Sequence, residues 1–534
     1  MSVITRTTLD PVSRDRSDDD GQADSSSTDS GIEAPQRSAR NARTRILTGS
    51  TALALLVGGI YAVVGSRQLS DNSFLTHLAT GRVLLDSGLP GTNPFLYSSE
   101  SFPIPSYWWS LILATVEKLT GGAGIRVLTA LGSAALGVLI VRLASRSDST
   151  SIESVGESVT GDTVSEGRSL LAIVVPTVLA TVCVMPFLNS RPQLPGFILL
   201  ALTVLIWNER RSPWWLVPVF AAWVNVHGTW LYGIAILGLF GVAELVEQRR
   251  VNSKRVLALG AAVTGTVLGG ALYPRAFEIM LLPTRQFGNE TERAALRLYR
   301  EWRPVAVDDP LFWLLIGLGL VAVFGSVQSG SGLQRRWASA ISAIGLVVLG
   351  LSGVRMVPIA AIALVPIVSS SLSRLGTIEM VKGRVATVLG TLGLIVIAGA
   401  IVHSAVGPSY DLRTYPTAMV DRMVDADLIG GDTKSLTHDY VGNFLEWRLG
   451  TEANTFVDDR PGAQTFIDYA TILGANKGWQ QALTKADPDV IIWNEQYREL
   501  PQKLRGSSEW VRSKKIGEWL LYCKPELVDR CKAI

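Results

Sequence analysis

Charged residues are scarce in this chain of 534 residues, where Asp, Glu, Lys and Arg together make up only 18%. A soluble protein of ordinary composition carries about 25% charged residues. The net charge is only +3 and is spread along the chain, so composition gives no argument for nucleic-acid binding. Mean hydropathy is positive, and long apolar runs recur over most of the length. These features are typical of a polytopic α-helical membrane protein.

Cysteine is rare as well, with three residues in the chain. Cys183 lies inside an apolar run and is expected to pack inertly. Cys523 and Cys531 near the C-terminus are a candidate disulfide if that end is extracytoplasmic, and otherwise belong to a frayed tail. The sequence contains no P-loop, no GxGxxG before a helix, no zinc-binding spacing, no HExxH and no GxSxG. These absences argue against an ATP-driven function within this chain.

Composition divides the chain into three regions. Residues 1–40 are rich in Ser and Asp and poor in apolar residues, so we expect a disordered cytoplasmic N-terminus. Residues 41–407 hold the apolar runs and form the expected transmembrane domain, with a first external loop at 66–122. Residues 408–534 alternate helix-like and strand-like stretches, which predicts a small extracytoplasmic α/β domain. Its strand-like stretches are 436–441, 454–459, 489–493 and 519–523.

Basic clusters between the apolar runs predict a topology with about 11 to 12 spans. All of these clusters fall on the cytoplasmic side if every run crosses except 106–119, which we interpret as a re-entrant or interfacial segment. They are Arg210/Arg211, Arg249/Arg250, Lys254/Arg255, Arg335/Arg336 and Arg374/Lys382/Arg384. Arginines at 37, 40, 43 and 45 place the N-terminus inside as well. The expected location is the plasma membrane.

In this topology the polar residues that are hard to explain as packing gather at the external face. They are Asp71, His77, Arg191, Gln193, Asn225, His227, Glu301, Trp302 and Arg355. Their concentration on one side predicts a single external site.

Each of these residues also has a plainer explanation. Asp71 just precedes a helical run, so it is either a general base or an N-cap. Arg191 and Arg355 suit phosphate recognition, but a snorkelling side chain or a structural ion pair explains them equally well. His77 is either a ligand or a polar loop contact. Glu301 is either a second acid or, with Trp302, part of an interfacial belt.

The order of short motifs adds a resemblance to a known family. The stretch from Asp71 to Phe95 reads D-x5-H-L-A-T-G-R-x-L-L-x-S-G-L-P-x-x-N-P-F. It is followed by RPQ, W-x-N-x-H-G, E-W-x-P, R-x-x-P, YVGNFLEW and FVDDR. Over about residues 46–525 this order resembles bacterial polytopic membrane glycosyltransferases of the GT-C superfamily. These enzymes depend on polyprenyl-phosphate sugars and include mannosyltransferases.

The resemblance implies transfer of a sugar from a polyprenyl-phosphate donor to an envelope glycan, lipid or protein on the external face. Asp71 would be the catalytic acidic residue. Arg191 and Arg355 would neutralise the lipid phosphate, and Asn225 and His227 would bind sugar or phosphate. Related chains often carry a second Asp two residues after the first, where this chain has Ser73. No cofactor is certain, and Ser73 weakens the case for a divalent metal.

Two other functions fit the same sequence. A lipid or sugar transporter would also use broken helices and intramembrane charges. However, the chain has no clear internal repeat, and its polar residues lie at one face rather than at the midplane. A catalytically silent GT-C relative, binding polyprenyl lipid or acting as a scaffold in an envelope complex, is compatible with Ser73.

Labelling with a membrane-impermeant maleimide tests the topology. A cysteine introduced at Asn208 should stay protected in intact cells, because that turn is expected to be cytoplasmic. A cysteine at Tyr440 should be labelled. Labelling of residue 208 from outside would remove the basis for a single external site.

Overall fold

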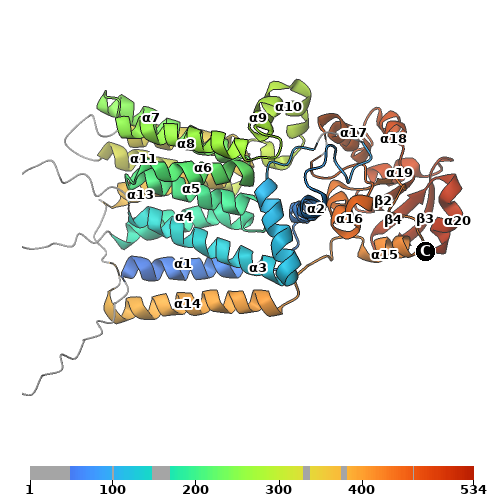
Figure 1. Ribbon diagram of the computed structural model, residues 1–534, viewed down its shortest axis with the longest axis horizontal. Coiled ribbons are helices and arrows are strands. Elements are labelled where there is room, and N and C mark those ends of the chain that lie inside the picture. Colours follow the sequence, from blue (N-terminus) through green and yellow to red (C-terminus); the bar gives the residue numbers. More distant parts are fainter. Residues whose placement is uncertain are drawn as a thin grey trace, which may run out of the picture. The chain divides into compact units, whose positions relative to one another are not determined.

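The computed structural model describes residues 48–98, 102–146, 169–328, 337–373, 380, 382–460 and 462–534. The segment 1–40, expected to be disordered, and the acidic loop 147–167 lie outside these residues. The described chain is mostly helical, with a small sheet near its C-terminus (Figure 1). A membrane-embedded helical protein with a C-terminal sheet is therefore confirmed as the coarse fold.

Each apolar run forms a helix. The helices are α1 (Gly49–Gly65), α3 (Tyr107–Ser145), α4 (Leu170–Val184), α5 (Gln193–Asn208), α6 (Leu216–Val226), α7 (Trp230–Gln248), α8 (Ser253–Ala271), α11 (Pro310–Gln328), α12 (Trp337–Leu351), α13 (Val357–Leu372) and α14 (Gly383–Val406). Within the described ranges, five helical segments are long and apolar enough to cross a membrane, by length and composition. They are Tyr107–Ser145, Leu170–Phe187, Trp230–Gln248, Val354–Leu372 and Gly383–Val406. The other apolar helices, most of them shorter, run alongside them (Figure 1).

Small residues allow the helices to approach closely. A Cβ at Gly393 of α14 would collide with the backbone of Leu55 in α1, and one at Gly59 would press on Val396. Because lipid tails are as apolar as the helices, close van der Waals packing of this kind drives helix association in membranes. The glycine pair therefore fixes the crossing of α1 and α14.

Helix α3 breaks at Gly121, whose φ of +67° lies in the left-handed region. The part before this break crosses the ends of neighbouring helices instead of continuing along them (Figure 1). It packs against α2 (Asn72–Ser87), where a Cβ at Gly81 would strike the carbonyl group of Ser110. The stretch 106–119, expected to be re-entrant or interfacial, is thus helical and serves as the support for α2.

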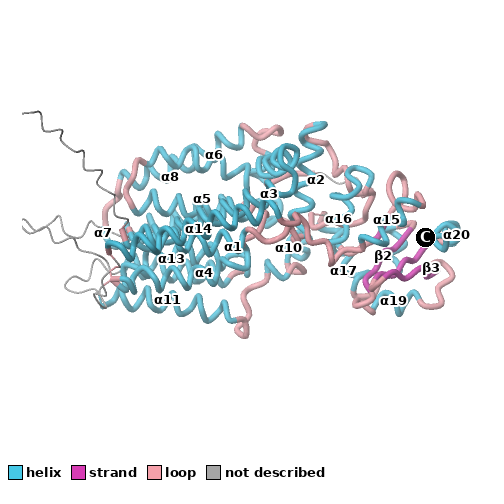
Figure 2. Tube along the Cα trace, turned by 90° about the horizontal axis from the view of Figure 1, so that it is seen from below, coloured by secondary structure: helices cyan, strands magenta, loops and turns pink. Residues whose placement is uncertain are grey.

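The C-terminal region contains a four-stranded sheet of order β1–β2–β4–β3. The strands are β1 (Ser435–Leu436), β2 (Val490–Asn494), β3 (Val511–Ile516) and β4 (Trp519–Cys523). β1 pairs with β2 in parallel, and the other two pairings are antiparallel. Helices α15 (Thr417–Asp425), α16 (Asp439–Leu449), α17 (Ala463–Leu473), α18 (Trp479–Ala486), α19 (Glu499–Leu504) and α20 (Val528–Ala533) accompany the sheet (Figure 2).

Two expected strands turn out differently. Residues 436–441 begin as β1 but continue as α16, because Asp439 lies in the first turn of a helix and favours it there. Residues 454–459 make only isolated bridges, through Thr455 to Leu96 and to Ser435. β3 was not expected, since VRSKKI is too polar to read as a strand. Cys523 and Cys531 form a disulfide.

The C-terminal region packs directly on α2. Phe74, Leu75 and Leu78 of α2 share one apolar core with Phe444 and Leu445 of α16. All five side chains are buried. Burying a large apolar side chain contributes about 1.5 to 3 kcal/mol, so this core firmly joins the two elements.

Arg126 of α3 ties together the ends of two helices. Its side chain is fully buried. Nη2 donates to the carbonyl oxygen of Ser66 at 2.6 Å, directly after α1, and Nη1 donates to that of Ser404 in the last turn of α14 at 3.1 Å. A cation is favourable there, because carbonyl groups at helix C-termini lack partners and carry partial negative charge.

We expect Arg126→Met to destabilise the protein strongly. Methionine keeps much of the volume but leaves the carbonyl oxygens of Ser66 and Ser404 buried without donors, at a cost of about 1 to 3 kcal/mol for each group. Thermal unfolding in detergent, followed by tryptophan fluorescence, should show a clearly lower melting temperature. Arg413→Met is the control, because that side chain is 87% exposed, and it should change little. Equal melting curves for the two variants would contradict this role of Arg126.

Candidate functional site

Asp71 stands at the start of α2, just after the chain leaves α1. Its Oδ1 accepts a hydrogen bond from the backbone N–H of Phe74 at 3.1 Å, which makes it the N-cap of α2. The plainer explanation of Asp71 is therefore confirmed. An N-cap carboxylate also benefits from the positive end of the helix dipole.

Asp71 is at the same time one end of a chain of charges. Its Oδ1 accepts from Nε of Arg191 at 2.6 Å, and its Oδ2 accepts from Nδ2 of Asn189 at 3.2 Å. The turn between α4 and α5 brings both residues to α2, and Asn189 Oδ1 accepts from the backbone N–H of Arg191. Both carboxylate oxygens of Asp71 are therefore engaged by this turn.

The charges continue from Arg191 to Glu301 and Arg355. Arg191 Nη1 donates to Glu301 Oε1 at 3.2 Å, and Arg355 Nε donates to Glu301 Oε2. Glu301 and Arg355 lie on two short 3₁₀ segments, Arg300–Trp302 and Val354–Met356, and the Arg355 guanidinium stands 5.4 Å from the centre of the Trp302 ring. Negative and positive groups thus alternate along the row Asp71, Arg191, Glu301, Arg355.

These pairings hold the charges in place. Burial alone would lower the pKa of Arg191, but the carboxylates of Asp71 and Glu301 reverse this and raise it. Burial alone would raise the pKa of Glu301, but the guanidinium groups of Arg355 and Arg191 lower it. Arg191 and Glu301 are therefore both held in their charged forms at neutral pH.

A cavity of about 430 Å³ opens beside this row, and we call it the arginine cavity. It is lined by most of the residues that the sequence predicted for the site: His77, Arg191, Gln193, His227, Trp302 and Arg355. Apolar side chains, among them Phe197, Ile279 and Leu282, also line it. Cationic and apolar groups in one cavity match a ligand that carries both an anion and a hydrocarbon.

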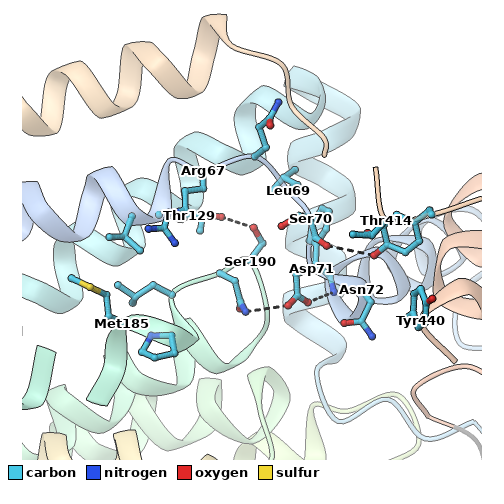
Figure 3. A pocket seen from close by; sticks show the side chains of 18 of the residues that line it. Arg67, Leu69, Ser70, Asp71, Asn72, Thr129, Met185, Ser190, Thr414 and Tyr440 are labelled. Carbon is cyan, nitrogen blue, oxygen red and sulfur yellow. Dashed lines mark hydrogen bonds between the residues drawn. The ribbon is translucent and has the colours of Figure 1, made fainter. Parts of the chain in front are cut away.

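A second cavity of about 570 Å³ is lined by Asp71, and we call it the Asp71 cavity. Asp71, Asn72, Ser190, Thr414 and Tyr440 are among the polar side chains that surround it (Figure 3). Ser190 is held by a 2.8 Å hydrogen bond to Thr129 of α3. Asp71 therefore faces a polar space, whereas the arginines face the partly apolar one.

Both histidines of the arginine cavity are neutral. Burial, reinforced by the positive charge of Arg355, lowers the pKa of His227 to about 3, and its Nδ1 lies 2.8 Å from the hydroxyl of Thr229. Burial and the positive charge of Arg460 likewise lower the pKa of His77 well below its usual range, and its Nδ1 lies 3.0 Å from the hydroxyl of Ser106. These imidazoles offer polar contacts and add no positive charge.

Asn225 does not line either cavity, in contrast to the role expected of it. Its side chain is fully buried, and Nδ2 donates to the carbonyl oxygens of Gly269 at 2.7 Å and Ala221 at 3.3 Å. The bond to Gly269 holds α6 against α8, and the bond to Ala221 lies within α6. Asn225 thus supports the turn that carries His227, and does so as a packing residue.

Two charged residues that the C-terminal region brings to the site were not predicted from the sequence. Asp459 and Arg460 line the arginine cavity, and the hydroxyl of Ser73 donates to Asp459 Oδ2. Tyr299 lines the same cavity and stacks on Phe466 of α17, with ring centres 4.0 Å apart. The motif FVDDR holds two of these residues and was the available signal, but nothing in its spacing indicates which partner it meets.

Arg460 also anchors the C-terminal region to α2. It donates to the hydroxyls of Thr80 and Thr76 at 2.7 and 2.8 Å, and to Glu446 Oε2 at 3.1 Å. Thr76 donates to Glu446 as well, and Asp458 pairs with Arg460 at 3.2 Å. Glu446 and Asp458 are fully buried, so two carboxylates share one guanidinium.

Comparison with known proteins returns no matching family model and no matching curated protein. Within the described ranges, no group of three or more His, Cys, Asp or Glu side chains is placed to hold a metal ion.

The buried acid pair makes stability depend on pH. Burial, followed by the negative charge of Asp458, raises the pKa of Glu446 well above its usual range. A raised carboxyl pKa stabilises the fold below the ordinary pKa of about 4.3, and this contribution is lost as pH rises toward the folded-state pKa. Glu446→Gln imitates the protonated form, so its melting temperature relative to wild type should increase between pH 5 and pH 8.

Glu452→Gln is the matched control, because Glu452 is an exposed residue of the same region. It should show no such trend. A loss of stability in Glu446→Gln that is greatest at pH 8 would show that the charged form of Glu446 is the stabilising one.

Proposed function

We propose that the protein is a polytopic plasma-membrane glycosyltransferase of the GT-C type. It moves a sugar, as mannosyltransferases of this type do, from a polyprenyl-phosphate donor to an envelope glycan, lipid or protein. The shorter apolar helices cross the membrane together with the five longer ones. The N-terminus is cytoplasmic, and the C-terminal α/β domain and both cavities face outward.

The observation that carries this proposal is the lining of the arginine cavity. Arg191 and Arg355 line it together with apolar side chains, which suits the phosphate and the first prenyl units of a lipid donor. The departing group of the reaction is a lipid phosphate, on which negative charge develops. Preorganised guanidinium groups stabilise such charge most strongly where water is excluded.

One observation favours a function without catalysis. Both oxygens of Asp71 already accept hydrogen bonds, and residue 73 is serine. A protein that binds polyprenyl lipid without turnover would need only the arginine cavity, so binding and transfer must be measured separately.

Binding is tested with geranyl phosphate, a ten-carbon prenyl phosphate, against geraniol. Wild-type protein should bind the phosphate and not the alcohol. Arg355→Met should weaken binding about 10- to 100-fold, because a charge-assisted hydrogen bond contributes about 1.5 to 3 kcal/mol. Arg303→Met is the control, because Arg303 is exposed and donates to backbone carbonyl oxygens of its own loop.

Transfer is tested with radiolabelled polyprenyl-phosphate sugars and octyl glycosides as acceptors. Wild-type protein should release polyprenyl phosphate and label the glycoside. Binding without turnover would leave the lipid-binding function standing. Equal binding by wild type and Arg355→Met, together with no transfer, would refute the proposal.

A further inference from the structure

Asp459 is held in place against α2 although it is far from it in the sequence. Its backbone N–H donates to Asn443 Oδ1 of α16 at 3.0 Å, and its Oδ2 accepts from the hydroxyl of Ser73. The side chain is only 15% exposed. Its position is therefore fixed from two sides.

The carboxylate of Asp459 accepts few hydrogen bonds. Oδ1 is buried and has no hydrogen-bond partner, and Nε of Arg460 is 3.8 Å away. Oδ2 accepts from the Ser73 hydroxyl, and a carboxylate oxygen has two lone pairs. Because Asp459 lines the arginine cavity, its carboxylate can accept a further hydrogen bond from a hydroxyl group in this cavity.

Asp71 offers no comparable oxygen to the arginine cavity. It faces the Asp71 cavity instead, and its two oxygens accept from Phe74, Arg191 and Asn189. Taking up a proton would break its contact with Arg191. Asp71 is thus suited to positioning Arg191, and Asp459 is the carboxylate beside the arginines that can still accept a proton.

The surroundings of Asp459 also favour proton uptake. Burial raises the pKa of Asp459, and the negative charge of the neighbouring Asp458 raises it further. The positive charges of Arg460 and Arg191 and the hydrogen bond from Ser73 lower it, but the net shift is upward. Other titratable groups that interact with it are Asp439 of α16, Tyr299 of the external loop and Tyr415 before α15. A carboxylate with a raised pKa is a stronger general base near neutral pH.

We infer that Asp459, from the C-terminal domain, is the general base that takes the proton of the acceptor hydroxyl, and that Asp71 is a positioning residue for Arg191. This inference rests on the proposed function. The acceptor oxygen forms a bond to the anomeric carbon, while the bond from that carbon to the phosphate oxygen breaks. Its electron pair leaves with the lipid phosphate, between Arg191 and Arg355, and the acceptor proton passes to the Asp459 carboxylate.

The test compares Asp459→Asn with Asp71→Asn in single-turnover transfer from a radiolabelled polyprenyl-phosphate sugar to octyl glycosides, over a range of pH. Asp459→Asn should lower the rate constant by about 100-fold or more and abolish its rise with pH, because a general base contributes about this much. Geranyl phosphate should bind it as it binds wild type. Asp71→Asn should weaken binding of geranyl phosphate and keep the rise with pH.

Asp468→Asn is the control for Asp459→Asn. Asp468 lies on α17 of the same region, where it pairs with Lys485, and it should behave as wild type. A rate constant for Asp459→Asn within about threefold of wild type, or an unchanged pH profile, would overturn the inference.

Ser73→Ala is a second variant in case Asp459→Asn does not fold. The Ser73 hydroxyl lowers the pKa of Asp459, so its loss should shift the rise in rate to higher pH. A shift to lower pH, or none, would count against Asp459. If wild-type protein transfers sugar and both variants behave normally, only this inference fails; if wild type neither binds geranyl phosphate nor transfers, the proposed function fails and this inference with it.

Discussion

One guanidinium, that of Arg191, connects the parts of the site. It is largely buried and donates to Asp71 and Asn72 at the start of α2 and to Glu301 in the segment Arg300–Trp302. A buried cation is tolerated only when partners surround it, and removal of one partner of a buried pair is far more costly than the pair is stabilising. The turn before α5, the start of α2 and the loop 300–302 therefore have to come together for the charge to be balanced.

Helix α2 makes the second set of contacts that builds the site. Ser73, Thr76 and Thr80 recur at spacings of three and four residues, so they lie on one face of the helix. That face meets Asp459, Glu446 and Arg460 of the C-terminal region. Its N-cap, Asp71, meets Arg191. A single helix thus links the membrane-embedded part, through its cap, with the C-terminal domain, through its polar face.

The helices and much of the site could be predicted from the sequence, because each depends on a signal that is local or that sums over the chain. Apolar runs predict helices directly. The distribution of basic clusters between the runs predicts a topology in which Arg191, His227 and Arg355 lie on the same side as the first loop. Sequence reasoning missed β3, whose residues are polar, and it did not foresee that Asn225 packs α6 against α8. The role of Asp459 could not be predicted for another reason. Asp459 contacts Ser73, which lies 386 residues earlier in the chain, and no sequence pattern in either segment indicates this contact.

The serine at position 73 can be understood from this contact. Its hydroxyl donates to Asp459, which an aspartate side chain could do only in its protonated form. Two carboxylates at that distance cannot both be ionised in a buried setting, so an acid at 73 would force a shared proton. Serine instead stabilises the charged form of Asp459. The GT-C chains that this sequence resembles often carry a second acid in the first loop. Here the C-terminal region supplies a carboxylate beside residue 73, so serine at this position is compatible with an active site.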